Sequence, residues 1–466
     1  MGEAPMKGLM FSMGLPIVLS MMFQAVYNIV DSAFLANMSE AGEEALTALG
    51  LAFPVQLLMV AVAIGTGVGT NALVAKSLGE KNYSRANKAA GNSIFLGFVI
   101  SLLFLLFAIF IVPVYVRSQN SNGAISETAV LMCIDYLRIC CGASFGIIFF
   151  SIFEKLLQAC GNSIWSTISQ VIGAVANIVL DPIFIFGWFG LPALGVRGAA
   201  LATVLGQVAS AVLGLLFHLK YDTTLKTKIK YLKPDLLTIR IIYGIGLPAI
   251  ISQALLTVMT YGMNLILGRL PEIGENCVTV YGLYCKIQQM IIFAAVGMRD
   301  AITPILSFCF GMGNRKRVNE AINTGFLYTF ILMVIGLVLM EALSVPLAHF
   351  FSLSDPTFTI CVDCVRIVSL GFVFAGCLIA AQGIFQAIGC GLESLIVGAG
   401  RQVVFVLPVA SLLSRTVTGF ETSSHIWWTF MIGEILTLAV TIPLYICAYN
   451  KRIMPLKAVE GHAANH

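Results

Sequence analysis

Long hydrophobic runs, separated by short polar or Gly/Pro-rich breaks, follow one another along almost the whole chain. Most of them reach the roughly 20 residues that an α-helix needs to cross a bilayer. The pattern predicts twelve membrane-spanning helices, at residues 9–36, 46–76, 92–116, 128–157, 163–188, 194–219, 240–269, 278–309, 322–351, 358–388, 394–418 and 425–449. Prolines inside five runs predict kinks, because the proline ring removes a backbone donor. They are Pro16, which we expect to kink the first helix, Pro54, Pro182, Pro248 and Pro304.

Composition supports an all-α integral membrane protein. Of 466 residues, 58% are hydrophobic and only 11% are charged, and the mean hydropathy is +0.93. Soluble domains do not have this composition. The first apolar run continues far beyond the length of a signal peptide, so we expect it to be retained as a helix.

The second half of the chain repeats the first. A shift of 232 residues places Gly14-Leu15-Pro16 on Gly246-Leu247-Pro248, and further matches hold the same register as far as Asn87 and Asn319. The repeat predicts two pseudo-symmetric six-helix bundles. The expected domains are an N-terminal bundle at 1–220, a basic linker at 221–239, a C-terminal bundle at 240–450 and a tail at 451–466.

Charge sets the expected orientation. Lysine and arginine concentrate in the two termini and in the loops on their side, above all in the linker, whereas the opposite loops hold only Arg117, Arg197, Arg269 and Arg415. The positive-inside rule therefore places both termini in the cytoplasm. Each half then enters the membrane from the same side, and internal repeats of this kind are typical of alternating-access transporters.

The first helix carries a polar face. Ser20, Gln24, Tyr27, Asn28 and Asp31 follow one another at steps of three or four residues and so share one side. A carboxylate inside a transmembrane helix costs about 2.5 to 3.5 kcal/mol on insertion scales, so such groups usually face a cavity and serve an ion or a substrate. The alternative is a polar residue that pairs with a neighbouring helix.

Two later helices carry comparable faces. The fifth presents Gln170, Asn177 and Asp181, and the sixth presents Thr203, Gln207 and Ser210. Depth estimates from about 1.5 Å of rise per residue place Asp31, Asp181 and Thr203 in the outer half of the bilayer. Oxygen ligands at one depth suit Na⁺ or a shared proton. In the second half Asp31 is replaced by Met263, so we expect only the first bundle to keep the acids.

Other charges have two interpretations. Lys286 could neutralise Glu434 or face substrate in a central cavity, and Glu341 also lies inside a predicted span. The remaining charges favour ordinary roles. We expect Asp135/Arg138 and Asp363/Arg366 to form structural pairs at i, i+3, Asp300 to pair with Arg299, and Glu154 and Lys155 to be solvated. One CxxC, at Cys361 and Cys364, has no second pair at zinc-ribbon spacing, so we expect no metal centre or cofactor.

Several motifs, taken together, resemble the multidrug and toxic compound extrusion (MATE) transporters over nearly the whole chain, in particular their prokaryotic DinF-like or MepA-like branch. They are Leu15-Pro16, Tyr27-Asn28 and Val30-Asp31, the Ala-Leu-Gly of 48–50, Gly79 with Asn82, Asn177 with Asp181-Pro182, and the segment 198–203. The resemblance implies a V-shaped pair of six-helix bundles. It also implies a cation site formed by Asp31, Asn177, Asp181, Thr203 and Tyr136, with Gln24 lining the cavity. The seventh helix lacks the acid of the NorM-like branch, which favours coupling in the first bundle.

The sequence thus favours a multidrug efflux antiporter, coupled to H⁺ or Na⁺, that exports cationic or amphipathic organic compounds. We expect a monomer in a bacterial plasma membrane, with lipids and small molecules as partners, no nucleic acid and no cofactor beyond the coupling ion. The alternative is a flippase for lipids or lipid-linked oligosaccharides. A flippase of that kind would need several basic side chains to hold a pyrophosphate, and this chain offers few for its cavity, chiefly Lys286. No HExxH or DDxxD motif occurs, so we do not expect an enzyme.

Overall fold

A computed structural model describes residues 2–36, 42–119, 126–222, 224–225, 229–350, 353 and 355–457. In these ranges, ten helices are long and apolar enough to cross a membrane, and two bent helix pairs bring the number to twelve. The prediction of an all-α membrane fold with twelve spans is confirmed.

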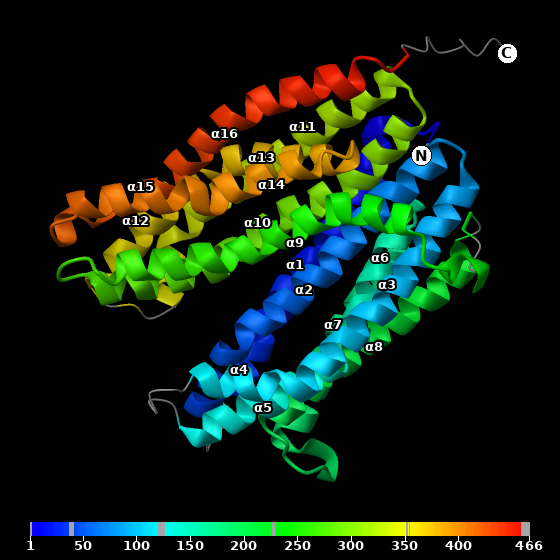
Figure 1. Ribbon diagram of the computed structural model, residues 1–466. Helices are drawn as coiled ribbons and strands as arrows, with labels where there is room; N and C mark the ends of the chain where they lie inside the picture. The colour runs from blue at the N-terminus through cyan, green and yellow to red at the C-terminus, as the bar shows by residue number, and fades with distance from the viewer. Residues whose placement is uncertain are drawn as a thin grey trace. The chain divides into compact units, whose positions relative to one another are not determined.

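The first repeat runs from α1 to α8 (Figure 1). Its helices are α1 (Met6–Ala36), α2 (Gly42–Gly79), α3 (Tyr83–Phe110), α4 (Val112–Gln119), α5 (Glu127–Gly142), α6 (Phe145–Ala159), α7 (Ser163–Phe186) and α8 (Val196–Tyr221). The second repeat comprises α9 (Leu236–Leu267), α10 (Gly274–Gly311), α11 (Arg315–Phe350), α12 (Thr357–Ser369), α13 (Phe372–Ala387), α14 (Gly391–Ala399), α15 (Val406–Leu413) and α16 (Trp428–Ala448). A π-helical turn, Gly400–Val404, joins α14 to α15.

Two spans are broken where the sequence predicted continuous helices. The α5–α6 pair bends by 43° and the α12–α13 pair by 48°. Neither break contains a proline, whereas the helix continues through Pro16, Pro54, Pro182, Pro248 and Pro304. The breaks fall at equivalent places in the two repeats, next to Gly142 and Gly371. The bent span is therefore a feature of the repeated unit.

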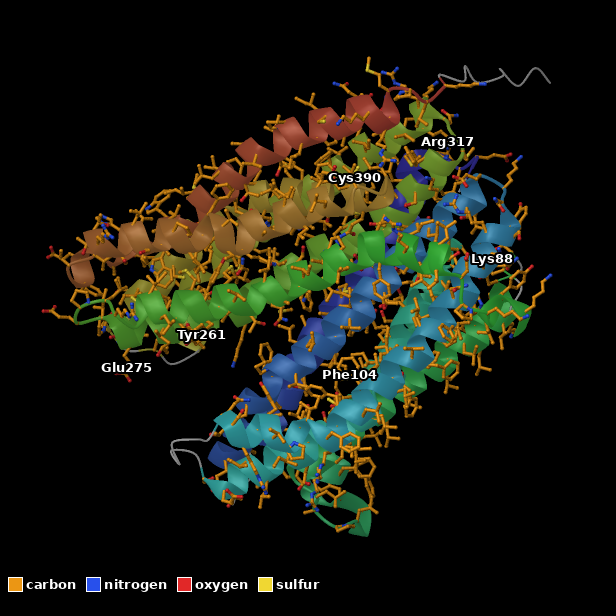
Figure 2. All side chains as sticks on the ribbon, viewed as in Figure 1. Lys88, Phe104, Tyr261, Glu275, Arg317 and Cys390 are labelled. Carbon is orange, nitrogen blue, oxygen red and sulfur yellow. The ribbon has the colours of Figure 1, made fainter. Side chains whose placement is uncertain are left out.

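On α3, a charged side chain lies near the start of the helix and apolar side chains lie along its middle. Figure 2 shows Lys88 near the start of α3 and Phe104 further along the same helix. The same helix exposes Phe98, Leu102, Leu103 and Phe110, each by more than half. Apolar side chains exposed in this way are suited to contact with lipid.

The chain divides into two compact units, one formed by Met1–Val18 with Ile251–His466 and the other by Leu19–Ile250. Both α1 and α9 change unit two residues after an equivalent proline, Pro16 or Pro248. Within one unit, a Cβ on Gly297 of α10 would lie 2.8 Å from Cα of Val18, and within the other a Cβ on Gly65 of α2 would meet the side chain of Ile250.

Each unit therefore contains the opening turns of the other repeat's first helix. The units do not coincide with the domain limits expected at 220 and 240, and the division into two bundles at the linker stays a prediction.

One of the expected ion pairs is wrong. Asp135 pairs with Arg197 of α8 instead of Arg138, with 2.6 Å between Oδ2 and Nη2. The reason is that α5 packs against α8, and Arg197 reaches the carboxylate through both Nε and Nη2. In the second repeat, Arg366 donates to the hydroxyl of Ser344.

The charges inside the second unit are paired locally. Arg401 donates to both oxygens of Glu434, at 2.9 to 3.2 Å, so the proposed Lys286–Glu434 pair is wrong. Glu341 accepts a hydrogen bond from Ser369. The expected pair of Arg299 and Asp300 is confirmed, with 2.9 Å between Nη2 and Oδ1.

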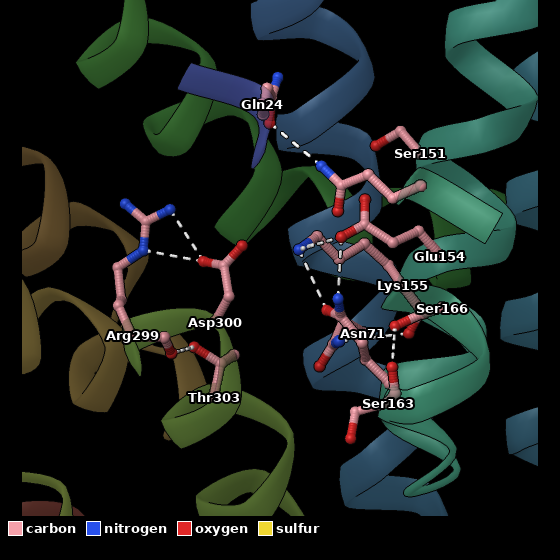
Figure 3. A network of polar contacts seen from close by, with 12 residues as sticks. Gln24, Asn71, Ser151, Glu154, Lys155, Ser163, Ser166, Arg299, Asp300 and Thr303 are labelled. Carbon is pink, nitrogen blue, oxygen red and sulfur yellow. Dashed lines mark hydrogen bonds and ion pairs between the residues drawn. The ribbon is translucent and has the colours of Figure 1, made fainter. Parts of the chain in front are cut away.

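Glu154 and Lys155 of α6 are buried, not solvated as expected. Their residues are 5% and 3% exposed. Lys155 Nζ lies 3.5 Å from Glu154 Oε1 and donates to Gln158 Oε1, while Gln158 Nε2 donates to the Glu154 carboxylate at 2.8 Å (Figure 3). The cluster is buried because α6 packs on α2, where Gly67 leaves room for the lysine stem.

Candidate functional site

A cavity with about 420 Å³ of empty space, part of it open to solvent, lies within the unit Leu19–Ile250. Four helices supply its walls. The lining residues are Gln24 and Tyr27 from α1, Phe150 from α6, Gln170, Gly173, Ala174 and Asn177 from α7, and Thr203, Gly206, Gln207 and Ser210 from α8. The walls therefore combine side-chain amides and hydroxyls with two aromatic rings.

Close packing of α7 on α8 forms one side of this cavity. A Cβ on Gly173 would lie 2.6 Å from the carbonyl oxygen of Gly206, and a Cβ on Gly206 would lie 2.7 Å from the carbonyl oxygen of Gly173. Only glycine at both positions lets the two backbones approach so closely, and small residues commonly serve this purpose between membrane helices. The approach brings the polar faces of α7 and α8 into one cavity.

Side-chain amides connect the walls. Gln170 Nε2 donates to Gln24 Oε1 at 3.1 Å and so joins α7 to α1 (Figure 3). Deeper in α7, Asn177 Nδ2 lies 3.4 Å from Asp181 Oδ1 and 3.4 Å from Thr203 Oγ1. The Asn177 amide therefore stands between a fully buried carboxylate and a hydroxyl on the neighbouring helix.

Two amide oxygens on the cavity wall lack a hydrogen-bond donor among the described residues. Gln170 Oε1 and Asn177 Oδ1 are buried and accept no hydrogen bond from any described residue. A buried acceptor without a donor costs about 1 to 3 kcal/mol, so a group that satisfies both oxygens is favoured there. Metal cations and N–H or O–H donors of a ligand have that chemistry. The walls that the structure describes around them carry no charged side chain.

Most of the candidate residues chosen from the sequence meet here. Gln24, Gln170, Asn177, Thr203 and Gln207 all line the cavity. Asp181 lies behind the wall and is in contact with it through Asn177.

The other candidates lie elsewhere or are not described. Tyr136 is buried in α5, where its hydroxyl accepts from Gln56 of α2 at 2.6 Å, and it is not a lining residue. Lys286 is exposed on α10, in the other unit. The side chains of Asn28 and Asp31 lie outside the described residues, although both positions belong to α1.

The sequence reasoning missed the residues that shape the cavity without polar groups, namely Phe150, Gly173, Ala174 and Gly206. Glycines facing each other on consecutive helices were the one available signal, and it required knowing how α7 and α8 are rotated.

A repeated bundle of twelve spans with a cavity between the helices of one unit defines a polytopic membrane transporter of the internal-repeat class. The MatE family model matches the chain twice, at residues 16–183 and 248–412. The chain belongs to the MatE family and is a MATE transporter.

Known relatives match the chain from end to end. "Multidrug export protein MepA" of Staphylococcus aureus (strain MRSA252) is 23% identical over 459 residues, which cover 98% of each chain. The protein of the same name in Staphylococcus saprophyticus is also 23% identical, over 98% of this chain and 97% of that protein. A solved structure described as the outward-facing conformation of a multidrug resistance MATE family transporter is similar with a TM-score of 0.87 and 25% identity, over 96% and 97% of the two chains.

Proposed function

We propose that this protein is a multidrug efflux antiporter that exports cationic or amphipathic organic compounds in exchange for H⁺ or Na⁺. Alternating access in a bacterial plasma membrane, with both termini cytoplasmic, would carry the exchange. No cofactor other than the coupling ion is required, and we expect the protein to act as a monomer. The observation behind the proposal is the cavity that joins Gln170 and Asn177 to the buried carboxylate of Asp181.

The relatives support export of organic compounds. Two of them are named multidrug export proteins and match this chain over its full length. The cavity agrees with this, since Tyr27 and Phe150 offer aromatic faces to an amphipathic cation and the amides offer acceptors at fixed positions.

The geometry suggests how an ion and a substrate could compete. Asn177 Nδ2 is shared by Asp181 and Thr203, at 3.4 Å from each. A proton or Na⁺ on Asp181 would remove the negative charge that attracts this amide, and the amide would then turn toward Thr203 and the cavity. Because a ligand shifts an equilibrium only by its difference in affinity between two states, ion and substrate must prefer opposite orientations of Asn177.

Transport in proteoliposomes tests the proposal. We expect efflux of a fluorescent organic cation to follow an imposed gradient of either H⁺ or Na⁺, with the two gradients applied separately. Asp181→Asn and Asp31→Asn should each abolish the dependence on that gradient. Asp135→Asn is the matched control, because it removes a carboxylate whose ion-pair partner, the side chain of Arg197, is 62% exposed, and it should keep wild-type coupling.

Gradient-driven efflux at the wild-type rate by both acid variants would refute the cation coupling. Movement of a sugar-linked lipid that needs no ion gradient would favour the flippase instead.

A further inference from the structure

The second unit contains a partly buried ion pair that the proposed transport site does not use. Arg401, in the π-helical turn Gly400–Val404, donates through Nε to Oε2 of Glu434 at 2.9 Å and through Nη2 to Oε1 at 2.9 Å. The side chains are 14% and 13% exposed. The pair joins the span that contains α14 and α15 to α16, and its two-point geometry is the strongest form of a carboxylate–guanidinium contact.

Glycine contacts show which part of the first repeat corresponds to this pair. In the first repeat, a Cβ on Gly173 would meet the hydroxyl of Ser210, and a Cβ on Gly206 would lie 3.0 Å from Cβ of Asn177. In the second repeat, a Cβ on Gly400 would lie 3.2 Å from the hydroxyl of Thr437, and a Cβ on Gly433 would lie 2.8 Å from Cγ2 of Val406.

One constant shift in sequence aligns Gly173 with Gly400, Gly206 with Gly433 and Ser210 with Thr437. The crossing of α7 and α8 therefore corresponds to the crossing at Gly400 and Gly433.

The ion pair stands one residue beyond each of these glycines. Arg401 follows Gly400 as Ala174 follows Gly173, and Glu434 follows Gly433 as Gln207 follows Gly206. Both Ala174 and Gln207 line the cavity of the first repeat. A methyl group and an amide on the cavity wall are thus replaced, at the same crossing, by a guanidinium and a carboxylate that bind each other.

The contact that corresponds to Asn177 has also lost its polar group. Val406 makes the contact with Gly433 that Asn177 makes with Gly206, so the second repeat lacks the amide that joins the cavity to an acid. Val406 lies six residues after Gly400, whereas Asn177 lies four residues after Gly173, and the π-helical turn Gly400–Val404 falls within the longer interval. Neither charge of the pair is available to an ion or a ligand while the other is present.

We propose that the Arg401–Glu434 pair closes the second repeat's counterpart of the cavity and so confines ligand binding to the unit Leu19–Ile250. The two residues determine which repeat accepts the exported compound. This inference rests on the proposed function, because it assumes that the cavity of the first repeat is the binding site.

The decisive variant carries Arg401→Ala together with Glu434→Gln, which gives the second repeat the residues of the first. Both charges leave together, so no unpaired charge remains buried. Equilibrium dialysis of purified protein with radiolabelled tetraphenylphosphonium counts the bound cations. We expect one per chain for the wild type and two for the double variant. Arg401→Glu with Glu434→Arg keeps a pair in reversed order and should bind one.

A second set of variants identifies the site that is occupied. Ala174→Phe fills the first cavity and should reduce binding from one to none in the wild-type background, and from two to one in the double variant. A double variant that still binds one cation per chain, or an Ala174→Phe variant that binds as the wild type does, would overturn the inference.

The structure of the double variant separates this inference from the proposed function. Failure of every protein to bind the probe would refute organic-cation transport. A new cavity beside Gly400 and Gly433 would then still support the closing role of the pair, and side chains collapsed over that place would refute it.

Discussion

Replacement of Lys155 by methionine should strongly destabilise the unit Leu19–Ile250. Methionine has a similar length and fills the space over Gly67, but it removes the cation that lies 3.5 Å from the buried Glu154 carboxylate. At 3.5 Å, and with an effective dielectric constant of about 20, the lost attraction amounts to about 5 kcal/mol. Removal of one partner from a buried pair costs about 3 to 5 kcal/mol in practice.

Thermal unfolding in detergent measures this effect. A dye that fluoresces on reaction with thiols reports unfolding, because Cys133, Cys140 and Cys141 are buried free cysteines of the same unit. With about 2 to 4 °C per kcal/mol for a unit of this size, Lys155→Met should lower the midpoint by roughly 6 to 20 °C.

Two controls decide whether the buried charge is the cause. Glu154→Gln combined with Lys155→Met removes both charges and keeps a side chain that can bond to Gln158, so most of the loss should be recovered. Arg197→Gln breaks the exposed pair with Asp135 and should shift the midpoint little, since exposed pairs contribute about 0 to 1 kcal/mol. A double variant as unstable as Lys155→Met alone would refute the reasoning.

Two further changes give sharp expectations. Burial alone would raise the pKa of the Asp222 carboxyl, but hydrogen bonds from His218, Cys160 and Thr224 outweigh it and hold the pKa below its usual value. The stability that these bonds supply is present at neutral pH and is lost as the pH falls through that lowered value. Melting curves of Asp222→Asn and wild type should therefore differ at pH 7 and converge below about pH 4. Gly173→Ala should reduce both stability and ligand binding because its methyl group meets Ser210. Adding Ser210→Ala should restore only part of the stability, since the methyl group would still lie 2.6 Å from the carbonyl oxygen of Gly206; full recovery in the melting assay would contradict this.

The periodicity of the sequence was enough to predict the helices and the polar faces. Gln170 and Asn177 share one side of α7, and Thr203 and Gln207 share one side of α8, because helical spacing is fixed by local backbone geometry. All four line the cavity. The bends beside Gly142 and Gly371 were not predictable in the same way, since neither sequence contains a proline.

Pairing between helices was the part that the sequence predicted poorly. Asp135 was expected to pair with Arg138 and pairs with Arg197. A pair with Glu434 was one of two interpretations of Lys286, and Glu434 pairs with Arg401 instead. An i, i+3 neighbour is identified by the chain alone. A partner on another helix depends on the rotation and depth of both helices, which only their packing sets.

The sequence by itself determined the class of protein, the twelve spans and the repeat. The length and periodicity of the apolar runs and the register of the repeat depend only on the order of the residues. The tertiary structure decided where each repeat places its buried charges. Lys155 of α6 lies over Gly67 of α2, whereas Arg299 of α10, at the position equivalent to Gly67, lies over Gly383 of α13, at the position equivalent to Lys155. Either helix of the crossing can supply the cation if the other supplies a glycine, since the space between them holds one long side chain. That choice becomes visible only when the two helices are packed together.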